Sequence, residues 1–78
     1  MNQSIIFNND ISFDEERHAW TFTGLLGGDL ITVVIDEKYH SRALPVTDEK
    51  KFDWEILVET WLEEFEPVGN EILLRVTL

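Results

Sequence analysis

Two histidines and one oxygen-rich segment are the parts of the sequence that could bind a metal ion. His18 and His40 lie in unrelated contexts, so a zinc site would need the fold to bring both to a shared carboxylate. Residues 10–14 alternate oxygen-bearing side chains as a calcium loop does at its start, but Glu15 stands where that loop needs glycine. We therefore expect neither a metal site nor a cofactor site.

The sequence also contains no recognisable catalytic motif. Gly24, Gly27 and Gly28 are not followed by the Lys-Ser/Thr pair and the helix of a phosphate-binding loop. The serines lack the flanking glycines of a nucleophile elbow. Paired carboxylates are common in a chain with 16 acids, so they are not evidence for acid/base catalysis. The sequence predicts a protein that is not an enzyme.

The charge balance narrows the class of partner. Sixteen Asp and Glu against six Lys and Arg give a formal net charge of -10 and a pI near 4.3. The bases are scattered, whereas duplex nucleic acids and anionic membrane surfaces bind clustered Lys and Arg. We expect no direct nucleic-acid binding and no membrane binding. A cytoplasmic location is expected, since the first residues lack the basic and apolar regions of a signal peptide.

A β-hairpin over residues 18–35 is the clearest element that must position these side chains. Gly27-Gly28 is a two-residue loop that tolerates the positive φ values of tight hairpin turns. Pairing outward from this loop defines a predicted core face, with Trp20 opposite Ile35, Phe22 opposite Val33, and Gly24 opposite Ile31. The pairs on the other face are Leu25 with Leu30, Thr23 with Thr32, and Thr21 with Val34.

The spacing of apolar residues predicts the main helix over residues 51–65. Its apolar stripe recurs at three-, four- and five-residue steps and consists of Phe52, Ile56, Leu57, Trp61, Leu62 and Phe65. Thr47 or Asp48 can cap the first amides of this helix. Pro67 and Gly69 are expected to stop it.

Shorter elements complete the predicted fold. Strands are expected at residues 5–7 and 71–78, and a short second helix over residues 36–44, before Pro45. The element order is then β-β-β-α-α-β. This order predicts a two-layer α+β fold, in which the main helix and the short second helix cover one face of an antiparallel sheet of three to four strands. Residues 1–78 are expected to form a single compact domain.

Several of these features together resemble a known family. The residues that carry the resemblance are Ile6-Phe7, Arg17, the strand from His18 to Thr23 that leads into a glycine turn, Leu30-Ile31, and Phe52 at the opening of the helix. They are similar to a small family of bacterial domains of unknown function, numbered 1488. The likeness covers most of the chain and rests mainly on its first half. It implies a small α+β fold in a bacterial cytoplasm, and the family has no assigned activity.

The predicted main helix carries the first candidate partner-binding residues. Glu55, Glu59 and Glu63 repeat at four-residue intervals, and each like-charge pair at this spacing costs about 0.2 to 0.5 kcal/mol. We interpret them either as a solvated face, with Lys51 relieving Glu55, or as a stripe that steers a basic protein surface toward the chain. Trp54 lies between the apolar stripe and the acidic face, so it is a candidate either for the core or for contact with a partner.

The sheet face opposite the helices is the second candidate surface. Leu25 and Leu30 would lie there with Val34 and Leu73, open to solvent or to another subunit. A chain of 78 residues without cysteine gains stability from self-association. These features favour a homodimer through this face.

The sequence therefore predicts a non-enzymatic protein-interaction or regulatory module with a protein partner. The alternative is a nucleic-acid mimic, whose carboxylates imitate phosphates and occupy the basic site of a DNA- or RNA-binding protein. The two hypotheses differ in salt response, because a mimic loses its partner as ionic strength rises. A small-molecule pocket between helix and sheet is a third class of site, for which 78 residues leave little volume.

Overall fold

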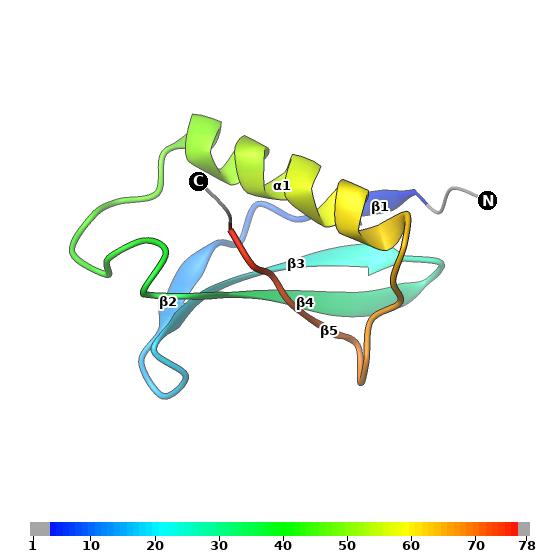
Figure 1. Ribbon diagram of the computed structural model, residues 1–78, viewed down its shortest axis with the longest axis horizontal. Coiled ribbons are helices and arrows are strands. Elements are labelled where there is room, and N and C mark those ends of the chain that lie inside the picture. The colour runs from blue at the N-terminus through cyan, green and yellow to red at the C-terminus, as the bar shows by residue number, and fades with distance from the viewer. Residues whose placement is uncertain (1–3, 77–78) are drawn as a thin grey trace.

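The computed structural model describes residues 4–76 and shows a helix lying across one face of a sheet (Figure 1). The elements, in chain order, are β1 (Ile5–Phe7), β2 (Ser12–Asp14), β3 (Ala19–Leu26), β4 (Asp29–Asp36), α1 (Asp48–Leu62) and β5 (Glu71–Leu73). The predicted α+β class is confirmed, as is the packing of the main helix on one side of the sheet.

Strands β3 and β4 form the predicted hairpin in the predicted register. Trp20 pairs with Ile35, Phe22 with Val33, and Gly24 with Ile31. Gly27 and Gly28 in the turn have φ values of 58° and 88°, a backbone region that residues with a Cβ atom rarely adopt. Because the turn fixes the register, the apolar residues of both strands alternate onto the face that α1 covers.

The sheet differs from the prediction in the number and direction of its strands. It has five strands in the order β1-β3-β4-β5, with β2 also paired to β3, where the sequence predicts three to four antiparallel strands. Strand β5 runs parallel to β4, because α1 crosses the sheet between them and returns the chain to the same end. It covers residues 71–73 of the predicted strand 71–78, whose last two residues lie outside the described part of the chain.

One edge of the sheet is made by β1 and β2, which pair with opposite ends of β3. Strand β2 is not among the strands that the sequence predicts. Between the two strands, the Asp10 carboxylate accepts a hydrogen bond from the Thr23 backbone N–H at 2.9 Å. The Asn8 amide donates to the Thr23 hydroxyl at 2.8 Å. The edge can break here because side chains satisfy the polar groups that a continuous strand would pair.

Residues 37–44 form turns and bends after β4 ends at Asp36, so the predicted short helix over residues 36–44 is wrong. Tyr39 N–H donates to the Asp36 carbonyl at 3.0 Å, and Leu44 N–H donates to the Ser41 carbonyl at 3.1 Å, as in separate tight turns. The Asp36 carboxylate also accepts a hydrogen bond from Lys38 N–H at 2.9 Å. Local bonds of this kind offer the backbone an alternative to a helix.

Helix α1 begins and ends earlier than the predicted range 51–65. Thr47 Oγ1 accepts a hydrogen bond from Lys50 N–H at 3.1 Å, so Thr47 is confirmed as the cap. The last turn contains no basic residue, and Glu63 and Glu64 follow it. Carboxylates at this end oppose the helix dipole, which accounts for the end at Leu62.

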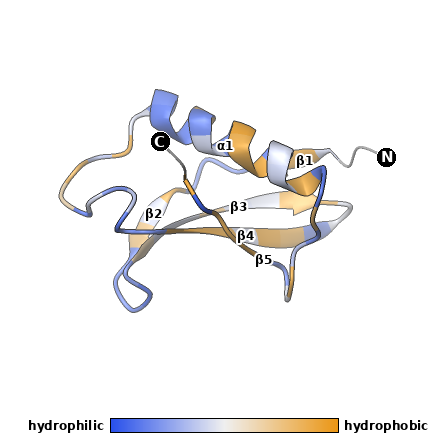
Figure 2. Ribbon diagram, in the orientation of Figure 1, coloured by the Kyte–Doolittle hydropathy of each residue, from blue (hydrophilic) through white to orange (hydrophobic). Residues whose placement is uncertain are grey.

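The core lies between α1 and the inner face of the sheet. Its largest fully buried side chains come from both layers and are Trp54, Phe22, Ile35, Ile72, Val33 and Val58. Figure 2 shows apolar residues concentrated in the central strands and polar residues in the connecting loops. Because burial of each such side chain is worth about 1.5–3 kcal/mol, the contact between helix and sheet is the main stabilising contact of the fold.

Candidate functional site

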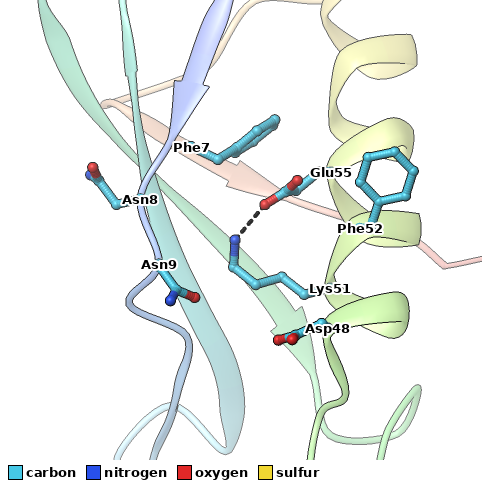
Figure 3. Close-up of a pocket in the computed structure, with 7 residues that line it drawn as sticks. All are labelled: Phe7, Asn8, Asn9, Asp48, Lys51, Phe52 and Glu55. Atoms are coloured by element: carbon cyan, nitrogen blue, oxygen red, sulfur yellow. Dashed lines mark hydrogen bonds and ion pairs between the residues drawn. The ribbon is translucent and has the colours of Figure 1, made fainter.

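A shallow cleft lies between α1 and the chain that follows β1 (Figure 3). It has a volume of about 270 Å³ and is lined by Phe7, Asn8, Asn9, Asp48, Lys51, Phe52 and Glu55. Strand β1 places Phe7 on the inner face, where it pairs with Gly24. The first turns of α1 place Lys51 and Glu55 opposite this strand, so the cleft joins the edge of the sheet to the start of the helix.

Lys51 is the buried charge of this cleft. The residue is 8% exposed, and its ammonium forms an ion pair with Glu55 one helical turn further along. The ammonium also lies 4.9 Å from the ring centroid of Phe22 and 5.9 Å from that of Phe7. The negative faces of the rings attract the cation. The contact of Lys51 with the Phe7 ring therefore links the start of the helix to β1, and Glu55 neutralises the lysine charge.

The face that the helix turns to the core matches the predicted stripe only in part: Leu57, Trp61 and Leu62 are partly buried against the core. Lys51, Trp54 and Val58 are buried, whereas Phe52 and Ile56 of the predicted stripe are 60% and 44% exposed. Trp54 is 2% exposed, so it belongs to the core and is wrong as a candidate for contact with a partner. A lysine can bury its aliphatic stem, and the spacing of positions 51, 54 and 58 fits the helical period. That spacing is the signal that would have identified Lys51.

The three glutamates of the predicted acidic stripe do not share one environment. Glu55 turns inward to Lys51, as the sequence predicts for this pair. Glu59 and Glu63 are exposed, and neither takes part in an ion pair within the described residues. The surface that could attract a basic partner therefore includes Glu59 and Glu63 without Glu55.

Leu25 and Leu30 lie on the sheet face opposite α1, as the register predicts. Ile6 pairs with Leu25 and Leu25 pairs with Leu30, so these three side chains form a continuous row across β1, β3 and β4. We call Ile6, Leu25 and Leu30 the outer row; they are 68%, 43% and 54% exposed. Leu73 on β5 is also exposed, whereas Val34, which the sequence predicts to be open on this face, is buried.

The two histidines have local partners. The His40 ring lies edge-on to Trp20 and Trp54, with centroid distances of 5.8 and 5.5 Å. His18 Nδ1 lies 3.1 Å from a guanidinium nitrogen of Arg42. In the part of the chain that the structure describes, no three His, Asp or Glu side chains are placed to hold a metal ion.

The described residues thus define a small α+β domain with a mixed five-stranded sheet and a helix on one face. No helix in residues 4–76 has the length and apolar character needed to cross a membrane. A solved structure with this fold is that of a protein of unknown function from the DUF1488 family of Shewanella loihica PV-4, with a TM-score of 0.68. The two sequences are 30% identical, and the match covers 99% of each chain.

At this identity and coverage, the chain belongs to the DUF1488 family, which confirms the resemblance found in its sequence. Neither the family models nor the curated proteins compared with the sequence gave a match.

Proposed function

We propose that this chain is a non-enzymatic protein-interaction module that self-associates through the outer face of its sheet. The observation that carries this proposal is the outer row, in which three large apolar side chains stay exposed side by side on neighbouring strands. Scattered exposed apolar residues are normal on soluble proteins, whereas contiguous ones are typical of interaction surfaces.

The distribution of charge favours a second copy as the occupant of this face. With a net charge of -10, two copies repel each other wherever their acidic surfaces meet. Asp14 and Asp36 both pair with Ala19, at the end of the outer face away from the hairpin turn. Nearer the turn, the outer-face residues of β3 and β4 are uncharged: Thr21, Thr23, Leu25, Leu30 and Thr32. A twofold axis would bring two such uncharged surfaces together.

Burial of Leu30 contributes to the free energy of dimer formation. Full burial of a leucine side chain is worth about 1.5–3 kcal/mol. Leu30 is 54% exposed, so its burial in an interface contributes about 1 kcal/mol for each copy. The symmetry doubles this contribution to about 2 kcal/mol, which is roughly thirtyfold in the dissociation constant.

Size-exclusion chromatography with light scattering over a range of concentrations tests the proposal. We expect a dimer that Leu30→Ala weakens by roughly thirtyfold and that Leu30→Glu abolishes. Leu44→Glu is the matched control, because Leu44 is similarly exposed, at 55%, and lies in the loop before α1. A monomeric wild-type chain at the highest concentration, or equal losses in both glutamate variants, would contradict the proposal.

The exposed carboxylates at the end of α1 and just after it support a second candidate function, the nucleic-acid mimic. Glu59 and Glu63 lie one helical turn apart and have no ion-pair partner within residues 4–76. Salt separates the two candidates. Added salt weakens a mimic bound to a basic protein, but it screens the repulsion between two copies of this chain and so leaves the dimer as strong or stronger. The light-scattering series and a pull-down, each at low and high salt, measure this difference.

A further inference from the structure

Half of the basic side chains gather at a pocket on the outer face of the sheet. Its volume is about 350 Å³, and Arg17, Lys38 and Arg75, three of the six Lys and Arg in the chain, line it. They come from the turn before β3, the turn after β4 and the segment after β5. The hairpin brings the first two segments together, since Ala19 pairs with Asp36. Arg75 joins them only when β5 pairs with β4.

The pocket has an apolar floor. Ala19 and Val34 form it and are 2% and 7% exposed, so the apolar surface that a ligand can reach is that of Leu73, which lines the pocket and is 67% exposed. Arg17 extends across the outer face to Glu71 on β5 and donates two hydrogen bonds to its carboxylate, at 2.6 and 2.9 Å. This bidentate pair fixes the Arg17 side chain beside the floor and neutralises its charge.

Lys38 and Arg75 supply the positive charge of the pocket. Neither has a carboxylate within ion-pair distance among residues 4–76. Asp36 is the one acid among the described lining residues, and its carboxylate accepts a hydrogen bond from the Lys38 backbone N–H at 2.9 Å. Asp14 and Asp36, the acids at this end of the face, accept hydrogen bonds from backbone N–H groups, and Glu71 is paired with Arg17. Lys38 and Arg75 are therefore the two bases of the pocket that can attract an anion.

We propose that this pocket binds a small molecule that carries a phosphate or carboxylate group on an apolar body. The anionic group lies between Lys38 and Arg75, and the apolar body lies against Tyr39 and Leu73, which also line the pocket. The pocket volume falls within the range of small-molecule sites, which is about 300–1,000 Å³. The site lies at the end of β3 and β4 away from the outer row, so it is separate from the proposed contact between two copies.

Phenyl phosphate is the first probe, followed through the amide chemical shifts of the ¹⁵N-labelled chain. We expect saturable shifts that centre on Ala19, Val34 and Lys38. Phenol and inorganic phosphate carry the apolar and anionic halves separately, and each should bind about tenfold or more weakly than phenyl phosphate. Benzoate, compared with phenyl phosphate, shows which of the two anionic groups the pocket prefers. Equal binding of phenol and phenyl phosphate would overturn the proposal.

Single substitutions test the role of the bases. Lys38→Gln and Arg75→Gln should each weaken phenyl phosphate binding by about three- to tenfold. Lys50→Gln is the matched control, because it removes the same charge from α1, outside the pocket, and should leave the affinity unchanged. Equal weakening by Lys50→Gln, or shifts that centre on Leu25 and Leu30, would overturn the proposal. The same affinity is expected in the Leu30→Glu variant, so the outcome does not depend on self-association.

Discussion

Removal of the Glu55 carboxylate should destabilise the domain more than removal of the Lys51 ammonium. The Lys51 side chain is 10% exposed and that of Glu55 is 21% exposed. In Glu55→Gln, the ammonium therefore loses its carboxylate while its stem stays packed between helix and sheet. In Lys51→Met, the remaining carboxylate is nearer to the surface and can rotate into water, and methionine fills the volume of the lysine stem.

The size of the expected loss in stability depends on how deeply the Lys51–Glu55 ion pair is buried. Breaking a fully buried ion pair by removing one partner costs about 3–5 kcal/mol. Partial exposure and the attraction of the Phe7 and Phe22 rings reduce this cost, so we expect about 2 kcal/mol for Glu55→Gln. For Lys51→Met we expect less than about 1 kcal/mol. In a domain of this size, 1 kcal/mol changes Tm by about 4–8 °C, so Glu55→Gln should melt about 8–16 °C below the wild type.

Denaturant unfolding followed by tryptophan fluorescence measures the free energies, and calorimetry measures Tm. The double variant Lys51→Met/Glu55→Gln removes both charges and should recover most of the loss, which a double-mutant cycle reports as a coupling energy. Glu59→Gln is the matched control at an exposed position of the same helix and should stay within about 0.5 kcal/mol of the wild type. The reasoning is refuted if Glu55→Gln is as stable as the wild type, or if Lys51→Met is the more damaging change.

Two further predictions concern the sheet. Gly24→Ala should lower the free energy of unfolding by about 1–2 kcal/mol in a denaturant titration, because the new Cβ would lie 2.9 Å from Ile5 Cδ1 and 3.1 Å from the Ile6 carbonyl oxygen. Adding Ile5→Val to this variant should restore part of the lost stability. An unchanged stability in Gly24→Ala would contradict the close packing of β1 on β3. The hydrogen-bonded Arg17 guanidinium lowers the pKa of Glu71 below its usual value of 4.5. The ion pair therefore stabilises the folded state fully above pH 4.5, and this stabilisation is lost as the pH falls through the lower pKa of the folded state. Glu71→Gln should therefore be slightly less stable than the wild type at neutral pH and should converge with it in acid, whereas a difference that stays constant across a pH series of denaturant titrations would contradict this assignment. The effect is small because both side chains are more than one third exposed, at 37% and 38%.

The hairpin is the part of the fold that the sequence predicts most fully. Gly27-Gly28 determines the turn, and the turn determines every pair from Leu26 with Asp29 outward. The positions of Leu25 and Leu30 on the outer face follow from the same register. Local pattern is sufficient here because the two strands are adjacent in the sequence.

The buried face of α1 is not predictable from apolar residues alone. Phe52 and Ile56 are exposed, whereas Lys51 is buried with Glu55 and two aromatic rings. A lysine buried with a partner breaks the relation between residue type and burial on which the stripe depends. The error shifts the predicted phase of the helix and places Trp54 between the apolar stripe and the acidic face instead of in the core.

Strand β2 and the direction of β5 depend on contacts between distant parts of the chain. The sequence Ser12–Asp14 contains a single apolar residue, so it lacks the alternation that predicts a strand. Strand β5 is parallel to β4 because α1 crosses the sheet, and no local pattern in Glu71–Leu73 encodes that path. The pocket depends on the same contact, since Arg75 reaches Arg17 and Lys38 only when β5 joins the sheet.

The break between β1 and β2 also limits how this protein can aggregate. A long, flat strand edge is a template on which further strands add to form fibrils. Here one edge consists of two three-residue strands separated by residues 8–11, and the opposite edge is the three-residue strand β5. Within residues 4–76, neither edge offers an extended run of free backbone groups to an incoming strand. The domain can therefore keep apolar residues exposed on the face of its sheet with little risk of growth through its edges.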